Sequence, residues 1–574
     1  MTVCAEIRCS FLALIWGDGV KRGQGNQGRR NNLLAASLIS DIVRTFLGPC
    51  GMEKLFIDIL GEATITKDGA TFLRKIDVEH PAAKAIIDAS IAVDNEVGDG
   101  TTSVALLIGA LIKRANKLLD LGIAPTVIID GYYEALVASL DLLNTLSQRT
   151  DNSNRQIMLC IAKTCLDSKL VSLPGMLDSS ASMVVDAITA VSDFKSNRVE
   201  IDNIKIEEKI GDPFETKLVY GIAIDKTIDS SAMPRAIRNA KVLLIDQELE
   251  FKGTRFDAEV RVDSPQDLQS YFVSSSNRVR SIVQSIIDSG ANIVISRKGI
   301  NLIAQNALAK SKIISLKRVK ENDMHWIERA TGAKITNDLS STPLSSCLGF
   351  AGYVHESYVG QDRMVFVEEC IDPRSVTILL RSSSKMLLDE YHRSVLSGLH
   401  VLQSYVVNPL TVYGGGSLEL LIADRIRKIV HMTSGRKQLV LEKFAEALEE
   451  IPLTIARNAG MNELDTTAKF RSRMSEQGDG KLGWYGINAI ERRVDDMRLK
   501  AVLEPASVKE QVLKTAVEVT CLLVRVDDVL MMKPVTNTHT HADGIKHSHS
   551  GGDKKHDHYF DRLGKQQRPT HHYF

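Results

Sequence analysis

The apolar positions follow a helical period towards both ends of the chain. Residues 33–46 carry Leu34, Leu38 and Ile42 at helical spacing, and longer amphipathic patterns cover residues 103–121 and 125–148. Apolar side chains that recur every three to four residues share one face of a helix, so each pattern predicts an amphipathic helix. The helical period returns near residue 395 and continues to about residue 530. Both ends of the chain are therefore predicted to be mainly helical.

The middle of the chain has a different pattern, in which short apolar runs alternate with helical spacing at residues 299–309 and 321–331. Runs of this length and composition are typical of buried strands: Val242–Ile245, Ile293–Ile295 and Ile313–Val319. Strands that alternate with helices indicate a small α/β domain inserted into the helical region. Residues 250–285 are polar and weakly periodic, which predicts an excursion from that domain.

Length and composition indicate a globular protein of several domains. The 574 residues exceed what one hydrophobic core supports and suffice for about three to four domains. Basic and acidic residues both number 71, so the formal net charge is zero. This balance gives no sign of the basic surface that nucleic acids or acidic lipids require, and we expect neither partner.

Nothing in the sequence predicts a membrane segment. No apolar run reaches the roughly 18 residues of a spanning helix, and the short run Phe11–Trp16 lacks convincing flanks of a secretory signal. We interpret that run as an edge strand or a ragged N-terminus. The eight cysteines are scattered without a CxxC pair, which is typical of reduced thiols in the cytoplasm.

The strongest chemical motif is the run Gly98–Ser103, which opens the predicted helix 103–121. Glycines let a ligand approach the backbone, and free amides at a helix N-terminus attract phosphate. The carboxylate of Asp99 could hold Mg²⁺, which bridges phosphates. The alternative is an ordinary Asp/Thr helix cap without a ligand.

Three further turns carry glycine: Leu47–Gly51, Thr66–Thr71 with Asp68, and Gly414–Gly416. Taken singly, such turns are most often structural, and Asp-Gly is most often a β-turn. The sequence contains neither a GxxxxGK[ST] motif nor a GxGxxG after a strand. Any ATP site in this chain must therefore be built differently from a P-loop.

In their order and combination, these segments resemble the group II chaperonins, which are the archaeal thermosome and the eukaryotic cytosolic chaperonin. The resemblance covers about residues 18–532 and is dense from 44 to 138. It is carried by the turns named above together with Asp77–Lys84, Ala258–Pro265, Arg329–Ala333, Asn458–Gly460 and Val502–Pro505.

The resemblance implies a multidomain α+β fold, with a mostly helical equatorial domain split by a two-piece intermediate domain and an α/β apical domain with a helical protrusion. The implied bounds are equatorial 1–149, intermediate 150–217, apical 218–368 with a lid protrusion at about 250–285, intermediate 369–405, equatorial 406–534, and a disordered His-rich tail 535–574. It also implies an ATP-dependent molecular chaperone in the cytoplasm. Its partners would be other subunits, in a homo- or hetero-oligomeric double ring of eight or nine subunits per ring, and unfolded client proteins.

Carried over by position, the resemblance assigns the cofactors ATP and Mg²⁺ to particular residues. Asp99 would be the Mg²⁺ ligand, Asp68 would help position the attacking water, and Lys169 would lie near the γ-phosphate. The nucleotide itself would be bound by Leu47, Gly48, Pro49, Asp99, Gly100, Thr101, Thr102, Ser103, Gly415 and, near the ribose, Glu504.

The sequence departs from the family at the position of the hydrolytic aspartate, where it has Ser397. A neutral hydroxyl cannot orient and deprotonate water as a carboxylate can. Phe46 and Cys50 also replace the usual Thr and Lys beside the phosphate turn. One alternative is therefore a structural subunit of a mixed ring that binds ATP but hydrolyses it weakly. In the other, Asp68 and an ordered water keep hydrolysis slow but real.

The low-complexity C-terminal segment is rich in histidine, with eight of the fourteen histidines after residue 538. Neutral imidazoles in HxH spacing can chelate Zn²⁺, Cu²⁺ or Ni²⁺, and the candidate ligands are His539, His541, His547, His549, His556 and His558. The alternatives are a disordered tail with incidental metal affinity and an assembly that responds to metal through the tail.

Deletion of residues 535–574 should leave ring assembly intact, because a polar disordered segment buries little surface. The same deletion should remove weak binding of Zn²⁺ or Ni²⁺. Electron microscopy of the truncated chain and metal titration of both forms check these two expectations. Loss of rings on truncation would contradict the first and would assign the tail a structural role.

Overall fold

The computed structural model describes residues 21–58, 61–169, 175–249, 277, 279–337, 344–371, 374–476, 484–531, 537–540 and 546–549. The chain divides into a small unit, Met1–Arg30 with Val526–Phe574, and a large unit, Asn31–Arg525. In the small unit, β1 (Lys21–Gln24) pairs antiparallel with β21 (Asp528–Met531), and β22 (Asn537–Thr540) pairs antiparallel with β23 (Lys546–His549).

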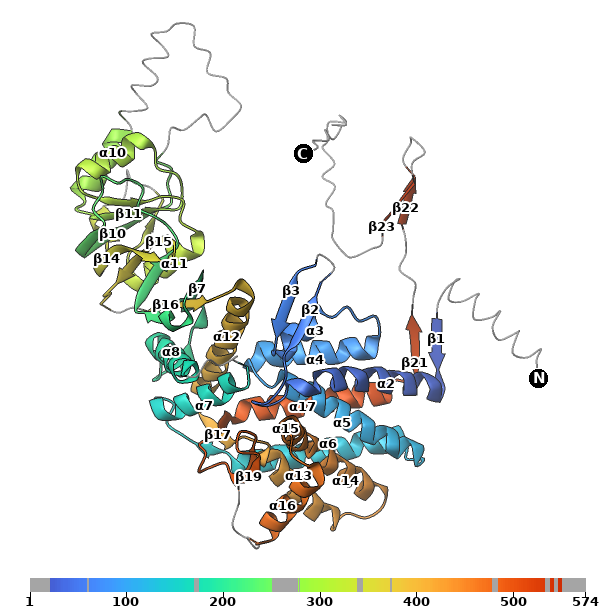
Figure 1. Cartoon of the computed structure of the whole chain (residues 1–574). Helices are drawn as coiled ribbons and strands as arrows, with labels where there is room; N and C mark the ends of the chain where they lie inside the picture. Colours follow the sequence, from blue (N-terminus) through green and yellow to red (C-terminus); the bar gives the residue numbers. More distant parts are fainter. Residues whose placement is uncertain are drawn as a thin grey trace. The chain divides into compact units, whose positions relative to one another are not determined.

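The largest hydrophobic core joins helices from both halves of the large unit (Figure 1). Helix α5 lies at its centre, and most of its residues are buried. The helices that form or border this core are α2 (Gly25–Val43), α3 (Gly69–Lys75), α4 (Pro81–Val97), α5 (Thr101–Asp120), α6 (Pro125–Leu146), α13 (Ser417–Val430), α14 (Arg436–Leu448), α15 (Glu450–Asn458), α16 (Glu463–Glu476) and α17 (Ala506–Arg525), with the short η1 (Arg44–Phe46).

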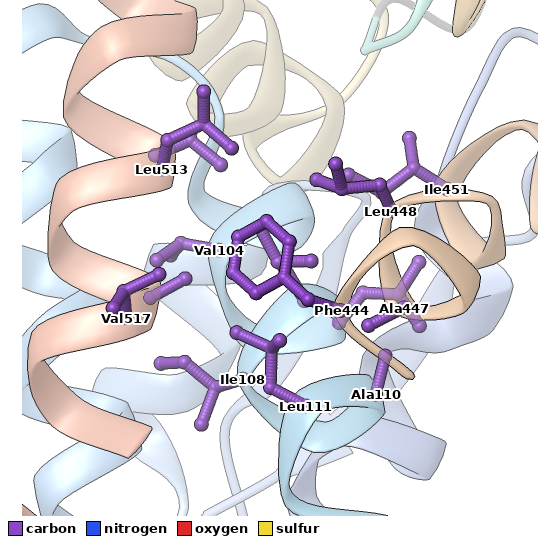
Figure 2. Packing of buried hydrophobic residues seen from close by; sticks show 14 of the residues in the cluster. Val104, Ile108, Ala110, Leu111, Phe444, Ala447, Leu448, Ile451, Leu513 and Val517 are labelled. Carbon is purple, nitrogen blue, oxygen red and sulfur yellow. The ribbon is translucent and has the colours of Figure 1, made fainter. Parts of the chain in front are cut away.

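The helical spacing of the sequence accounts for this packing. Val104, Ile108 and Leu111 lie on one face of α5, and Figure 2 shows them beside Phe444 of α14. Phe444 also makes an edge-to-face contact with Tyr132 of α6, with ring centroids 5.7 Å apart. The Tyr132 hydroxyl donates a 3.0 Å hydrogen bond to the carbonyl of Leu111, so the buried phenol is satisfied.

Short strands connect the helices of this region. The three-stranded sheet has the order β20-β17-β4, and there are two hairpins, β2-β3 and β18-β19. Their bounds are β2 (Lys54–Ile57), β3 (Ala63–Thr66), β4 (Gln148–Arg149), β17 (Leu410–Tyr413), β18 (Tyr485–Asn488), β19 (Arg493–Asp496) and β20 (Leu503–Pro505).

A second core belongs to the predicted α/β region. Its sheet has the order β12-β11-β10-β14-β15-β9, with β13 beside β10; β10, β11 and β12 run parallel and β14, β15 and β9 antiparallel. The elements are β9 (Gly221–Ile224), β10 (Ala236–Ile245), β11 (Ile293–Ser296), α10 (Leu302–Lys310), β12 (Ile314–Leu316), α11 (Glu321–Thr331), β13 (Ile335–Thr336), η4 (Leu344–Cys347), β14 (Gly349–Val359) and β15 (Asp362–Glu368).

The excursion expected at residues 250–285 ends earlier in the structure than predicted. Residues 250–276 and 278 lie outside the described residues, but 279–288 are helical. Val279, Val283 and Ile286 of this helix are buried in the second core. Their spacing of four and three residues places them on one helix face. The chain has therefore returned to the α/β core by Val279, and the expected limit at residue 285 lies too far along the sequence.

A third core is built from two separate stretches of the chain, before and after the α/β region. It packs three helices with a three-stranded sheet of order β7-β16-β8. The elements are α7 (Arg155–Asp167), α8 (Met176–Val191), β5 (Ser192–Asp193), β6 (Arg198–Val199), η2 (Ile201–Asn203), β7 (Ile204–Ile210), η3 (Pro213–Glu215), β8 (Lys217–Val219), β16 (Val376–Ser382) and α12 (Lys385–Val407).

The predicted mixture of a helical region with an inserted α/β region is confirmed. Each predicted helix and buried strand outside the excursion is present. Most ends shift by a few residues, but α2 begins at Gly25 instead of 33 and β10 at Ala236 instead of 242. Among the residues described, no helix is long and apolar enough to cross a membrane. The cysteines of the described part, from Cys50 to Cys521, are all free thiols.

Replacement of Phe444 by alanine should destabilise the helical region by about 3–5 kcal/mol, because it opens a cavity in a closed core. Phe444 is 0% exposed, whereas Leu439 on the same helix is 50% exposed. Leu439→Ala is thus a matched control that should cost far less. Urea unfolding followed by circular dichroism measures both; equal midpoints for the two variants would contradict the packing.

Candidate functional site

A cavity of about 590 Å³ lies within the large unit, a volume typical of small-molecule sites. Its wall combines the turn after η1, the start of α5, the end of α7, the glycine turn before α13 and the segments around β18 and β19. The predicted residues that line it are Leu47, Gly48, Pro49, Asp99, Gly100, Thr101, Thr102, Ser103, Lys169, Gly415 and Glu504. The structure thus brings together residues that are far apart in the sequence.

The start of α5 presents free backbone amides to the cavity. Asp99 stands between Gly98 and Gly100, whose φ angles of 72° and 83° are readily adopted by glycine. Gly100 is the N-cap residue, and no side chain caps the helix. The amides at the start of an uncapped helix attract anions. The alternative of an ordinary Asp/Thr cap is therefore not what this turn forms.

Asp68 has a different local role from the one expected for an Asp-Gly turn. It is the N-cap of α3, and its Oδ2 accepts a 2.8 Å hydrogen bond from the amide of Thr71. The other carboxylate oxygen, Oδ1, is buried and has no hydrogen-bond partner among the described residues. A buried acceptor of this kind is costly unless a ligand, water or ion satisfies it. Asp68 is thus a helix cap instead of part of the β-turn that a lone Asp-Gly most often forms, and its second oxygen remains available for chemistry.

Lys169 connects these two carboxylates. Its Nζ lies 3.4 Å from Asp99 Oδ1 and 3.9 Å from Asp68 Oδ1, and it donates a 3.5 Å hydrogen bond to the carbonyl of Gly98. Burial alone would lower the pKa of Lys169, but Asp99 and the neighbouring acidic groups raise it above its usual value. Burial alone would raise the pKa of Asp68, but Lys169 and the hydrogen bonds of Thr71 outweigh it and lower that pKa. Lys169 and Asp68 are therefore both charged near neutral pH.

The turn Leu47–Gly51 is held in place by a residue from the other half of the chain. The Asn458 side-chain amide donates to the carbonyls of Arg44, at 3.1 Å, and Leu47, at 2.8 Å. A Cβ at Gly51 would lie 2.2 Å from the Phe46 carbonyl oxygen, so only glycine fits there. The Asn-Ala-Gly motif at 458–460 therefore has a structural explanation.

Glu504, which also lines the cavity, belongs to a buried ion cluster. Lys509 Nζ lies 2.7 Å from Glu504 Oε2 and 2.9 Å from Glu419 Oε1. Burial raises the pKa of Glu504, and Lys509 partly offsets that rise. Glu504 thus presents a positioned carboxylate to the cavity, and the hydroxyls of a sugar could donate to it.

Ser397 does not line the cavity, but it lies on the face of α12 that meets this region. On the same face, Glu390 Oε1 accepts a 2.9 Å hydrogen bond from the amide of Lys67, and Arg393 donates at 3.2 Å to the carbonyl of Ile65. One turn beyond Ser397, His400 packs against Gly98, where an added Cβ would lie 2.2 Å from the His400 Cβ. Ser397 itself is buried.

The predicted tail ligands are only partly described. His541, His556 and His558 lie outside the described residues. His539 is directly opposite His547 in the register of β22 and β23, and His549 is opposite Asn537. Within the described part of the chain, no group of three or more His, Cys, Asp and Glu residues is placed to hold a metal by itself.

Sequence reasoning missed several residues that line the cavity. Lys67 and Asp167 adjoin the predicted Asp68 and Lys169, so their place next to the motifs could have signalled them. The segment Ile487–Glu491 and Lys500 also line the cavity, and no motif marks them. Their place depends on the β18–β19 hairpin, whose approach to this site is a tertiary feature.

The arrangement suits a nucleoside polyphosphate. Uncapped helix amides, Lys169 and Lys67 supply positive charge, and Asp99 with the free oxygen of Asp68 can meet a cation that the phosphates also bind. Mg²⁺ is commonly held by one or two carboxylates together with substrate phosphates, so the lack of an all-protein cluster among the described residues fits that ion.

Comparison with known proteins identifies the family of the chain. Residues 39–534 match the model of the TCP-1/cpn60 chaperonin family. The thermosome subunit alpha of Aeropyrum pernix is 39% identical over 525 residues, which cover 91% of this chain and 94% of the relative. A thermosome subunit of Methanocaldococcus jannaschii is 38% identical over 539 residues, covering 94% of this chain and 98% of the relative.

A further relative, the thermosome subunit alpha of Thermoplasma acidophilum, is 39% identical over 528 residues, which cover 91% of this chain and 95% of that subunit. These matches extend through the helical, α/β and third-core regions alike. The chain therefore belongs to the TCP-1/cpn60 chaperonin family, among the group II chaperonins that include the thermosome.

Proposed function

We propose that the chain is an ATP-dependent subunit of a double-ring group II chaperonin, which encloses unfolded proteins and folds them. The observation that carries this proposal is the cavity in which the uncapped start of α5, Asp99 and Lys169 converge. The thermosome subunits to which the chain is similar support the same function.

In this proposal the nucleotide lies along the cavity with its phosphates at the start of α5. The amides of Thr101–Ser103 and the turn Gly48–Pro49 bind phosphate oxygens, and Asp99 holds Mg²⁺. Lys169 neutralises charge at the γ-phosphate, and Asp68 accepts a hydrogen bond from the attacking water through its free oxygen. Glu504 receives the ribose hydroxyls. Mg²⁺ would neutralise charge that develops on the phosphates.

We infer three domains that correspond to the three hydrophobic cores. The helical core would be equatorial, the third core intermediate and the α/β core apical. The third core is made from chain before and after the α/β region, which agrees with a two-piece intermediate domain. Residues 250–276, proposed as the protrusion, lie outside the described residues.

Exposed apolar residues on α2 support assembly with other subunits. Leu34, Leu38 and Ile42 are 60%, 54% and 40% exposed, whereas Ile39 and Val43 on the other face are buried. An apolar stripe on a surface helix marks a contact with another chain. The partners in the ring are identical or related subunits, and the proposed location is the cytoplasm, where the free thiols would stay reduced.

Asp99→Ala should abolish Mg-ATP binding, because the cation loses its principal protein charge. Isothermal titration of purified rings with Mg-ATP measures the affinity. Asp88→Ala, on an exposed position of α4, is the control with the same side-chain change. Unchanged affinity in Asp99→Ala would remove the basis for placing the phosphates at this turn.

Rings of this chain should hydrolyse ATP slowly, since loss of a positioned general base typically costs about 10²–10⁴-fold in rate. Ser397→Asp should raise kcat more than it changes ATP affinity, as expected for a group that acts in the transition state. Gly398 could reduce the gain, because glycine loosens the helix that carries the new carboxylate.

Single-turnover hydrolysis by assembled wild-type and Ser397→Asp rings measures this effect, and Ser397→Ala is the control that should remain slow. If the wild type already hydrolyses ATP at the rate of an ordinary thermosome, the missing aspartate is not the bottleneck.

A further inference from the structure

One carboxylate that lines the cavity, that of Asp167, has no role in the proposed function. Four acidic residues line it: Asp99, Asp167, Glu491 and Glu504. Ser397 cannot act as a base, and Asp68, which is not part of the cavity lining and has a lowered pKa, is assigned to orienting the water. The group that takes the proton of water is therefore sought among these four. Such a role for any of them rests on the proposed function, because it requires a nucleotide in the cavity.

Three of the four are committed to other contacts. Asp99 faces Lys169 at 3.4 Å, and Glu504 faces Lys509 at 2.7 Å. Glu491 accepts from Lys500 at 2.6 Å, and its pKa is lowered, first of all by that hydrogen bond. A carboxylate held by a cation at hydrogen-bond distance is a weaker base than a free one. Each of these three carboxylates is therefore already engaged by a lysine.

Asp167 differs from them. It is the last residue of α7, two positions before Lys169, and it is half-buried. Within the described part of the chain, no hydrogen bond or ion pair involves its carboxylate. Burial raises its pKa, and Lys67 offsets part of that rise. A general base works best when its pKa lies close to the working pH, so this carboxyl is poised better than its neighbours.

Lys67 supplies a counter-charge to Asp167. Its side chain also lines the cavity, and its Nζ donates a 3.1 Å hydrogen bond to the carbonyl of Pro49. Lys67 is only 7% exposed, and an ammonium has three donors, of which the turn uses one. The remaining donors can face a phosphate oxygen or Asp167. Lys67 thereby offsets part of the effect of burial on the pKa of Asp167 without pairing with it directly.

We propose that Asp167 is the general base of this chain, in the role that Ser397 cannot fill. Asp167 accepts a hydrogen bond from the attacking water and takes its proton. The water oxygen forms a bond to the γ-phosphorus while the bond from that phosphorus to the β,γ-bridging oxygen breaks. The electron pair remains on the departing ADP, and inorganic phosphate is the second product.

The pH dependence follows from the raised pKa of Asp167. Below that pKa the carboxyl is protonated and cannot accept a proton, so the rate of hydrolysis should fall as the pH falls. This fall should begin at a higher pH than it would for a base with the pKa of an ordinary aspartate. The charged and titratable groups around it are Lys67 before α3, Lys163 on its own helix, Lys169 beyond the helix end, and Glu53, Cys50 and Glu390 beside Lys67.

The test compares Asp167→Asn with Asp178→Asn in fully assembled rings. Asp178, in the first turn of α8, pairs with Lys163 and does not itself line the cavity, so its replacement also removes one negative charge near α7. We expect Asp167→Asn to lower the single-turnover rate about 10²-fold or more, with ATP affinity little changed. Asp167→Asn should also abolish the fall of the rate at acidic pH. Asp178→Asn should keep both the wild-type rate and this fall at acidic pH.

Addition of a carboxylate at residue 397 tests whether Asp167 acts in the chemistry or only in the structure. In Asp167→Asn rings, the added change Ser397→Asp should restore hydrolysis, because it supplies a base from α12. A wild-type rate for Asp167→Asn, or an unchanged fall of the rate at acidic pH, would overturn the proposal. If Asp167→Asn forms no rings, the pH–rate profile of the wild type tests the proposal. A wild-type rate that does not fall towards acidic pH overturns the proposal. A rate that falls at a higher pH than an ordinary carboxyl group would give supports it.

These experiments also distinguish failure of the proposed nucleotide site from failure of the role of Asp167. Wild-type rings that fail to bind Mg-ATP would refute the proposed function. Rings that bind Mg-ATP but show no single-turnover hydrolysis would refute the role of Asp167 alone and would leave the nucleotide site in place.

Discussion

The buried ammonium of Lys169 is the interaction on which the site depends. It joins the segment after α7, in the third core, to Asp99 before α5 and to Asp68 before α3, both in the helical core. An unpaired charge at this depth would cost several kcal/mol, so the cation and the carboxylates require one another. Two separately packed cores are therefore connected where the phosphates are proposed to lie. A ligand that changes the charge balance at this point acts on both cores at once.

The position of that cation relies on the rigidity of the surrounding helices. α5 is buried along most of its length between α14 and α17, so its first turn has little freedom to shift (Figure 2). A close-packed core transmits displacement instead of absorbing it. α12 contacts the same region through Glu390 and Arg393. Movement of α12 thus changes the hydrogen bonds of the very segment that carries Asp68, which gives the third core a mechanical link to the nucleotide.

The sequence predicted the helices and strands better than it predicted which of them contact one another. Helical spacing located α5, α6 and α11 within a few residues, because local periodicity determines which face of a helix is apolar. The glycine turns were found for the same local reason, but the approach of Asn458 to Leu47 and of Lys169 to Asp68 depends on contacts between residues far apart in the chain. Leu34 and Leu38 show the limit most clearly. They have the spacing of core residues, yet they are exposed, and only the packing of α2 reveals which of its two apolar faces is covered.

The substitution at 397 is understandable when the charges around the cavity are considered together. Asp68, Asp99, Asp167 and Glu504 lie in or beside it, against Lys67, Lys169 and Lys509. A bound polyphosphate adds several negative charges, and every further carboxylate at the phosphate end opposes its binding. A neutral Ser397 removes one such charge from the face of α12 and therefore costs the binding step nothing. Lys67, which adds positive charge beside Pro49, acts in the same direction. The site as a whole is thus biased towards holding the nucleotide, and whether it also turns the nucleotide over depends on a carboxylate that enters from α7 instead of α12.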